Sequence, residues 1–181
     1  MTLMKNFSFI IMDNLKFKKL SSAAYFFIVA GLTFAAGIGL LKISPQISPV
    51  SDDIEYYALA SNIAQGNGFS IDGQNPSIYR PPLFSTLLGG WFYLTQNNSL
   101  FSGSMFQAII HALGAGMAFF LFFHIFKSTH ISLFLALWLG LMPPHISRIM
   151  LLMQEPLIAL LTTFSILLTL KFIEIVFKGI I

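Results

Sequence analysis

The chain has 181 residues, of which 56% are hydrophobic and 9% are charged. Soluble domains are about 45–50% apolar and about 25% charged, so this composition excludes a soluble globular protein and indicates one integral membrane domain. The sequence contains no cysteine, which excludes disulfides, thiolate nucleophiles and cysteine-ligated metal sites. The formal net charge of +3 is too small and too dispersed to indicate nucleic-acid binding.

Four apolar segments are predicted to cross the membrane, which takes about 20 residues of helix. These spans cover residues 22–42, 104–126, 131–146 and 156–177. A fifth apolar segment at 83–95 is too short to span, since a helix of this length rises only about 20 Å. We expect it to lie in the membrane interface, with Trp91 and Tyr93 at the depth of the headgroups. The predicted fold class is an all-α, polytopic bundle of transmembrane helices, forming a single membrane domain over residues 1–181.

Basic residues predict the orientation of the spans. The segment before the first span contains Lys5, Lys16, Lys18 and Lys19. By the positive-inside rule, residues 1–21 are therefore expected in the cytoplasm and residues 43–82 in an external loop. This topology places seven of the ten lysines and arginines inside, whereas a spanning 83–95 segment would leave only four there. The expected location is a bacterial cytoplasmic membrane, crossed several times, with the N-terminus inside.

The same topology gathers most of the remaining charges on the outer side. The outward-facing acids, arginines and histidine are Asp52, Asp53, Glu55, Asp72, Arg80, His145, Arg148 and Glu155. Ionisable groups at the depth of a membrane are costly, so by default they indicate a function. The sequence thus predicts a polar site at the outer interface.

The external loop has local structure of its own. Residues 52–65 are predicted to form a short amphipathic helix, because apolar side chains recur there at helical spacing. Gly66 is a suitable C-terminal stop for that helix. Pro81 and Pro82 favour the start of the interfacial helix, since proline is favoured in a first helical turn.

Motifs in and after this loop resemble a known class of enzymes. They read Asp-Asp-Ile-Glu-Tyr (52–56), Ala-Ser-Asn-Ile (60–63), Gly-Asn-Gly-Phe (66–69), Tyr-Arg-Pro-Pro-Leu (79–83) and Gln-Glu-Pro-Leu (154–157). In this order they resemble the first external loop and a later span of the GT-C glycosyltransferases. Within that class, the branch of the protein mannosyltransferases and the lipid A aminoarabinose transferase is the most similar. Enzymes of the class have more than four spans, so the sequence is expected to be a truncated or N-terminal part.

The resemblance implies transfer of a sugar from a polyprenyl-phosphate-linked donor to a lipid, glycan or protein acceptor, outside the cytoplasmic membrane. It implies that Asp52 or Asp53 is the catalytic carboxylate, and the spacing to Tyr56 favours Asp52. Such a carboxylate takes the acceptor proton or holds a divalent metal that does. Arg80 would stabilise the departing phosphate, since a guanidinium offers it several donors. No nucleotide-binding fingerprint supports a nucleotide-sugar donor.

Six residues are candidates for binding substrate or its phosphate: Glu55, Tyr56, Arg80, His145, Arg148 and Glu155. Structural alternatives exist for several of the candidates. Asp52 and Glu55 fit a capping box, and Arg80 could extend to lipid headgroups. Arg148 and Glu155 could form an ion pair. No histidine spacing predicts a metal site, and a divalent metal at the carboxylates stays open.

Polar and small residues in the spans have simpler interpretations. Gln107 and His111 share one helix face and are expected to hydrogen-bond across helices. Small residues recur every fourth position at Gly31, Ala35 and Gly39, and again at Ala108, Ala112 and Gly116. Both rows are predicted to be helix-packing ridges.

Two other functions are compatible with the sequence. A non-catalytic membrane subunit would keep the loop without its chemistry. A transporter would be expected to carry ionisable groups near the bilayer midplane or an internal repeat.

Overall fold

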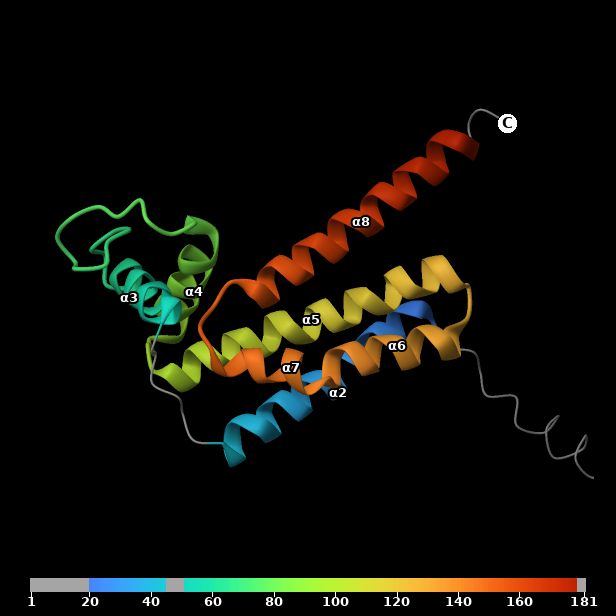
Figure 1. The fold of residues 1–181 in the computed structure, drawn as a ribbon, viewed down its shortest axis with the longest axis horizontal. Helices are drawn as coiled ribbons and strands as arrows, with labels where there is room; N and C mark the ends of the chain where they lie inside the picture. The colour runs from blue at the N-terminus through green and yellow to red at the C-terminus, as the bar shows by residue number, and fades with distance from the viewer. Residues whose placement is uncertain (1–19, 45–50, 179–181) are drawn as a thin grey trace, which may run out of the picture.

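The computed structural model describes residues 20–44 and 51–178 (Figure 1). Predictions for residues 1–19 and 45–50 lie outside the described residues. The described part folds into seven α-helices and one short 3-10 helix, which confirms the all-α membrane bundle. The elements are α2 (Ser22–Ile43), α3 (Asp52–Ala64), α4 (Pro82–Thr95), α5 (Leu100–Phe126), α6 (Thr129–Leu141), α7 (Pro143–Ile146), η1 (Ser147–Met150) and α8 (Glu155–Lys178).

Three helices, α2, α5 and α8, are long and apolar enough to cross a membrane. The segment predicted as a third span, 131–146, is not one straight helix. It divides into α6 and the α7–η1 segment, which are bent by 52° relative to each other, as in a broken span or a re-entrant loop. The cause is Pro143 and Pro144, which lack an N–H and hold Met142 in an extended conformation, with φ −59° and ψ 127°.

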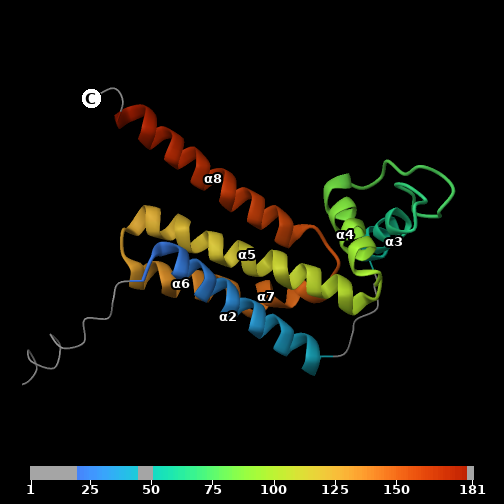
Figure 2. The ribbon, with the colours of Figure 1, turned by 180° about the vertical axis from the view of Figure 1, so that it is seen from behind.

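Helix α5 is the centre of the bundle and contacts α2, α6 and α8 (Figures 1 and 2). It begins four residues earlier than predicted, because the Ser99 hydroxyl accepts the N–H of Ser102 and caps the first turn. Helix α8 packs on α5 near Gly114 and diverges from it toward the C-terminal end (Figure 1). The bundle is therefore tight at one end of α8 and open at the other.

Only one of the two predicted small-residue ridges packs against another helix. On α5, Ala108 and Ala112 are buried, and Gly116 lies so close to the Phe26 ring that a Cβ would approach it to 2.7 Å. The ridge predicted on α2 is wrong, since Gly31, Ala35 and Gly39 are exposed. Helix α2 instead packs through the row Val29, Thr33, Gly37 and Leu41, which has the same four-residue spacing.

The predicted interhelical hydrogen bonds of α5 are confirmed. The buried Gln107 amide donates to the carbonyl oxygens of Leu151 (2.8 Å) and Met153 (2.6 Å), just before α8 begins. The His111 Nε2 lies 2.9 Å from the carbonyl oxygen of Gly140 on α6. These bonds tie the chain between α6 and α8 to the central helix.

Helices α3 and α4 form a packed pair at one end of the bundle, with α4 lying across its axis (Figures 1 and 2). We call this the α3/α4 end. Tyr56 and Ala60 of α3 are buried in one apolar cluster with Phe84, Leu88 and Phe92 of α4. The cluster also contains Phe106 of α5. The pair is thus attached to the first turns of the central span.

The end predicted for α3 and the start predicted for α4 are both present. Gly66 has φ +83°, and its N–H bonds to the Ile63 carbonyl while that of Asn67 bonds to Asn62. This is a Schellman-type helix end, which requires the left-handed conformation that glycine adopts readily. Pro82 occupies the first turn of α4.

A glycine sets how closely α3 and α4 approach. A Cβ at Gly89 would lie 2.8 Å from Ile63 and 2.9 Å from the Ala60 carbonyl oxygen, whereas one at Gly90 would meet nothing within 4 Å. We expect Gly89→Ala to lower the free energy of unfolding by about 1–3 kcal/mol, because the two helices must separate. Gly90→Ala is the matched control and should be neutral or stabilising. Thermal unfolding in detergent measures both, and equal melting temperatures for the two variants would contradict the close contact.

Candidate functional site

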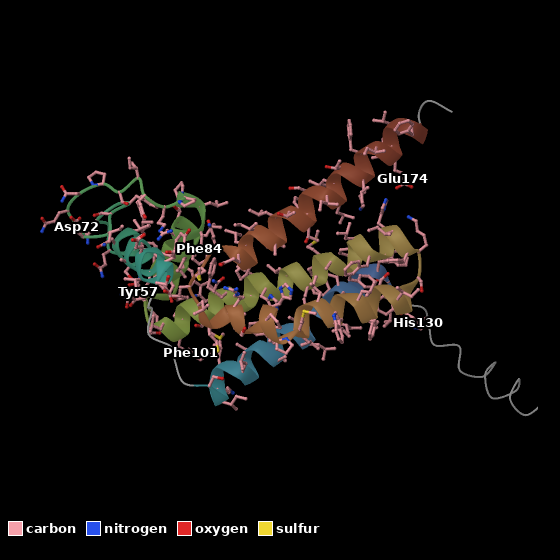
Figure 3. The ribbon with its side chains drawn as sticks, viewed as in Figure 1. Tyr57, Asp72, Phe84, Phe101, His130 and Glu174 are labelled. Carbon is pink, nitrogen blue, oxygen red and sulfur yellow. The ribbon has the colours of Figure 1, made fainter. Side chains whose placement is uncertain are left out.

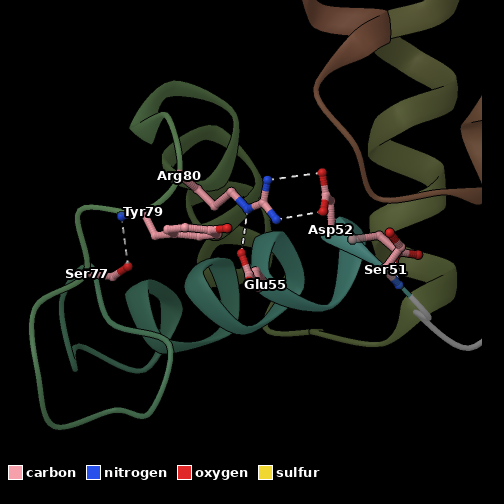
Figure 4. Close-up of polar contacts among 7 residues, drawn as sticks. Ser51, Asp52, Glu55, Ser77, Tyr79 and Arg80 are labelled. Atoms are coloured by element: carbon pink, nitrogen blue, oxygen red, sulfur yellow. Dashed lines mark hydrogen bonds and ion pairs between the residues drawn. The ribbon is translucent and has the colours of Figure 1, made fainter.

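A single arginine joins two carboxylates at the α3/α4 end (Figure 4). The Arg80 guanidinium donates from Nη2 and Nη1 to the two oxygens of Asp52, at 2.6 and 3.0 Å. Its Nε donates to Glu55 Oε2 at 2.5 Å. Asp52 and Glu55 are three residues apart and hence on one face of α3, so one planar guanidinium reaches both. We call these three residues the Arg80 cluster.

Two tyrosines flank the guanidinium. Its central carbon lies 4.9 Å from the ring centre of Tyr79 and 5.6 Å from that of Tyr56, within the range of a cation–π contact. Tyr56 is buried and packs edge-on against Phe84, with ring centres 5.4 Å apart. The Arg80 side chain is left only 18% exposed. The cluster is therefore shielded on the aromatic side and open on the Asp52 side.

The surroundings keep Arg80 charged and Tyr56 protonated. The hydrogen bonds that Arg80 donates, first to Glu55 and then to Asp52, raise the pKa of Arg80 above its ordinary value. Burial raises the pKa of the Tyr56 phenol, and the charge of Arg80 opposes this only in part. At physiological pH the site therefore presents a permanent cation beside a phenol that can donate a hydrogen bond.

The two adjacent aspartates have different environments. The Asp52 side chain is 48% exposed and bound to Arg80. Asp53 is buried, and its Oδ1 accepts the backbone N–H of Ser51 at 2.9 Å. The predicted capping box of Asp52 and Glu55 is wrong, since Ser51 is the N-cap and both carboxylates are directed to Arg80. Asp53 rather than Asp52 satisfies a backbone donor at this helix start.

A second charged pair lies next to the cluster, at the start of α8. Arg148 on η1 and Glu155 on α8 form an ion pair, with Nη1 and Oε1 3.7 Å apart and both side chains about half exposed. The ion-pair alternative for these residues is thus present. Glu155 is close enough to contribute to the raised pKa of Tyr56. Leu157, in the same first turn of α8, belongs to the apolar cluster of Tyr56.

One oxygen of this pair has no hydrogen-bond partner. The Oε2 atom of Glu155 is buried and accepts no hydrogen bond within the part of the chain that the structure describes. Buried polar atoms are nearly always satisfied, and exceptions gather at functional sites. This oxygen is therefore a candidate acceptor for a bound hydroxyl group.

His145 lies apart from the charged residues. It is exposed on α7 and lines a small cavity of about 80 Å³ together with His111 and Pro156. Among the hydrogen bonds and ion pairs of the described residues, none joins it to the Arg80 cluster. Its predicted role in binding substrate stays a prediction.

Asp72, the other outward acid, organises its own loop (Figure 3). Its carboxylate accepts the N–H groups of Asn75 (2.8 Å) and Gln74 (2.9 Å) and the Ser70 hydroxyl (2.9 Å). These bonds, those from Asn75 first, hold its pKa well below the ordinary value. The loop is tied to α3 by Asn62, which donates to the Ser70 carbonyl at 2.9 Å. Asp72 is structural in this arrangement.

Sequence reasoning overlooked two residues of the site. Tyr79 precedes the arginine and covers its guanidinium, and a tyrosine beside a lone arginine was the available signal. Asn62 lies within a recognised motif, but its loop contacts depend on the fold of residues 66–76. Both residues act by fixing the position of others.

The acidic residues do not form a ready metal site. Within residues 20–44 and 51–178, no group of three or more His, Asp or Glu side chains could hold a metal ion. Asp52 and Glu55 are directed to a cation already present, the Arg80 guanidinium. The donor set does not fit a resident divalent metal.

No protein-family model, curated protein or solved structure matches the chain in the comparisons.

The raised pKa of Tyr56 predicts an alkaline loss of stability. A folded-state pKa above the ordinary value of about 10 contributes stability that is present below pH 10. That contribution disappears as the pH rises through the folded pKa, because the unfolded chain releases the proton first. We expect unfolding measured in detergent from pH 8 to 11.5 to show this decline, and Tyr56→Phe to lack this component. Tyr93→Phe, at a side chain 62% exposed, should keep the wild-type profile; identical profiles for all three proteins would contradict the assignment.

Proposed function

We propose that the chain belongs to a glycosyltransferase that transfers a sugar from a polyprenyl-phosphate-linked donor to an acceptor at the outer face of a bacterial cytoplasmic membrane. The observation that carries the proposal is the combination of the Arg80 cluster with the Arg148–Glu155 pair at one end of the bundle. The ordered motifs supply the reaction class, and the distribution of lysines supports the outward direction of this end.

Asp52 is the proposed general base. It is the half-exposed member of the cluster, and each carboxylate oxygen keeps a further acceptor position beside its bond to Arg80. Arg80 is satisfied by two carboxylates, so we assign it to holding Asp52 in place rather than to binding phosphate. This changes the role that the motif resemblance implies for Arg80.

Arg148 is the proposed ligand of the donor phosphate. Its ion pair with Glu155 is long, at 3.7 Å, and its side chain is half exposed, so a phosphate can approach it. The donor phosphodiester carries one negative charge, as a carboxylate does, and bonds a guanidinium in the same bidentate manner, whereas the phosphate monoester that leaves carries more charge. The unpartnered Oε2 of Glu155 would then accept a hydroxyl of the bound sugar.

The reaction follows from these positions. The acceptor hydroxyl transfers its proton to Asp52 while its oxygen bonds to the anomeric carbon of the sugar. The bond from that carbon to the phosphate oxygen breaks, and its electron pair leaves with the polyprenyl phosphate. Arg148 stabilises the charge that develops on this leaving group. No step is assigned to a metal.

Membrane lipids are the expected surroundings of the site. Helix α4 buries one apolar face on α3 and leaves a second exposed, at Leu83, Leu87 and Leu94. These side chains lie on one side of the helix, at positions separated by whole turns. An interfacial helix with such a face would rest on acyl chains beside the charged residues and give the polyprenyl chain an apolar surface.

A non-catalytic membrane subunit is the second candidate. The complete pairing of Arg80 favours it, because the cluster also fastens α3 to the start of α4 without any substrate. Donor binding without transfer would be the mark of such a subunit.

Activity of an Asp52→Asn variant tests the proposed base. The chain is reconstituted in liposomes with polyprenyl-phosphate mannose or polyprenyl-phosphate aminoarabinose, and sugar transfer and donor binding are measured separately. We expect Asp52→Asn to lower transfer by roughly 100-fold or more while donor binding persists. Glu174→Gln, the same kind of change at the far end of α8, should leave both unchanged.

Donor binding by an Arg148→Gln variant tests the phosphate ligand. We expect it to bind the donor more weakly in the same liposomes, because the donor phosphate loses a bidentate partner. Wild-type transfer by Asp52→Asn would refute the base, and wild-type binding by Arg148→Gln would refute the phosphate ligand. Failure of the wild-type chain to bind either donor would remove both candidate functions.

A further inference from the structure

A cavity with several polar groups in its lining lies between α2, α5 and α8, at the end of the bundle opposite the Arg80 cluster. Helix α8 diverges from α5 at this end (Figure 1). The cavity has a volume of about 260 Å³. Its polar lining comes from all three helices, as Ser22, His124, Lys127 and Lys171. None of these residues belongs to the site described above.

Two lysines from different helices face this cavity. Lys127 ends α5 in a left-handed conformation, with φ +53°, and Lys171 comes from the last turns of α8. Like charges repel, so two cations beside one cavity are stabilised by an anion between them. Charged residues are only 9% of this chain, so such a pairing of lysines is informative. The acid on the same helix, Glu174, lies one turn after Lys171, and two lysines with one glutamate still leave positive charge.

Further groups of the cavity suit an anionic oxygen. Ser22 is the first residue of α2, a helix of 22 residues whose first N–H groups point toward this end. His124 lies one turn before Lys127 and can donate a hydrogen bond from its ring. The polar lining therefore offers cationic and neutral donors together.

The remaining walls distinguish a lipid from a free ion. They are formed by Phe120, Phe123 and Leu167, and Leu167 is buried. Because α8 diverges here, the cavity lies beside the acyl chains of the surrounding bilayer. An inorganic anion would gain nothing from aromatic walls, whereas a phospholipid places its glycerol and first methylenes against them.

We propose that this cavity binds the headgroup of an anionic phospholipid, with the lipid phosphate between Lys127 and Lys171 and the acyl chains along the diverging face of α8. The proposal is independent of glycosyl transfer. By the distribution of lysines the site lies in the cytoplasmic leaflet, whose surface carries anionic lipid.

Lipid titration of the purified chain tests the proposal. Phosphatidylglycerol, phosphatidylcholine of the same acyl chains, and inorganic phosphate are titrated separately, and bound lipid is counted by native mass spectrometry alongside the melting temperature. We expect phosphatidylglycerol to bind more tightly than phosphatidylcholine and to raise the melting temperature, and phosphate alone to do neither. Lys171→Gln should weaken the binding of phosphatidylglycerol roughly fivefold, and the double variant with Lys127→Gln should weaken it roughly 25-fold.

Lys42→Gln is the matched control, because Lys42 is an exposed lysine in the last turn of a spanning helix at the opposite end. It should leave the lipid preference unchanged. Circular dichroism checks that each variant is folded. If the double variant is not folded, the binding of phosphatidylglycerol by Lys171→Gln alone tests the proposal. Equal binding of the two lipids by the wild-type chain would overturn the proposal. So would an equal loss in Lys42→Gln and Lys171→Gln, or a melting temperature raised as much by phosphate as by phosphatidylglycerol.

Discussion

The contacts of the Arg80 guanidinium hold together the part of the chain that lies outside the bundle, namely α3, the loop after it and the start of α4. The guanidinium joins the first turns of α3 to the chain two residues before α4, although Asp52 and Arg80 are 28 residues apart in sequence. The residues between them close into a loop that Asn62 and Asp72 hold from within. Without the arginine, two carboxylates on one helix face would repel each other beside a buried tyrosine. One cation therefore sets both the position of Asp52 and the approach of α3 to α4.

The other part of the site is positioned from the bundle. Gln107 on α5 binds two carbonyl groups of the chain that leads into α8, the second of them at Met153. Glu155 follows two residues later, and Leu157 then packs in the apolar cluster of Tyr56. One segment of the site is thus positioned by the ion pairs of Arg80, and the other is positioned by the buried amide of Gln107. Apolar packing of Leu157 and Phe84 in a common cluster joins the two.

Features that depend on neighbouring residues could be predicted from the sequence, and partners that depend on the fold could not. The spans, the short helix 52–65 and its end at Gly66 follow from local periodicity and from glycine and proline stereochemistry. The residues of the charged site could also be found, because ionisable groups are rare in this chain. The pairing of Arg80 with Asp52 and Glu55 could not, since these residues become neighbours only when α3 folds back on α4.

The two rows of α2 that contain glycine show the same limit. Gly31 and Gly37 belong to rows with identical spacing, and the neighbouring α5, α6 and η1 decide which row is buried. Similarly, the bend after α6 could be expected from Pro143 and Pro144. Its effect on the distant His111 could not be predicted, because that effect depends on how three helices are arranged.

That consequence concerns the chemistry of His111. In a continuous helix the carbonyl of Gly140 would accept the N–H of residue 144, but that residue is a proline and has none. The imidazole of His111 lies 2.9 Å from this carbonyl oxygen and takes the place of the missing donor. A carbonyl can only accept, so the proton of a neutral His111 is fixed on Nε2, and its Nδ1 is left as a lone-pair acceptor. Pro144 thereby determines the tautomer of His111, which lies 33 positions earlier in the sequence. The proline removes a hydrogen-bond donor, and the histidine supplies one to the same carbonyl.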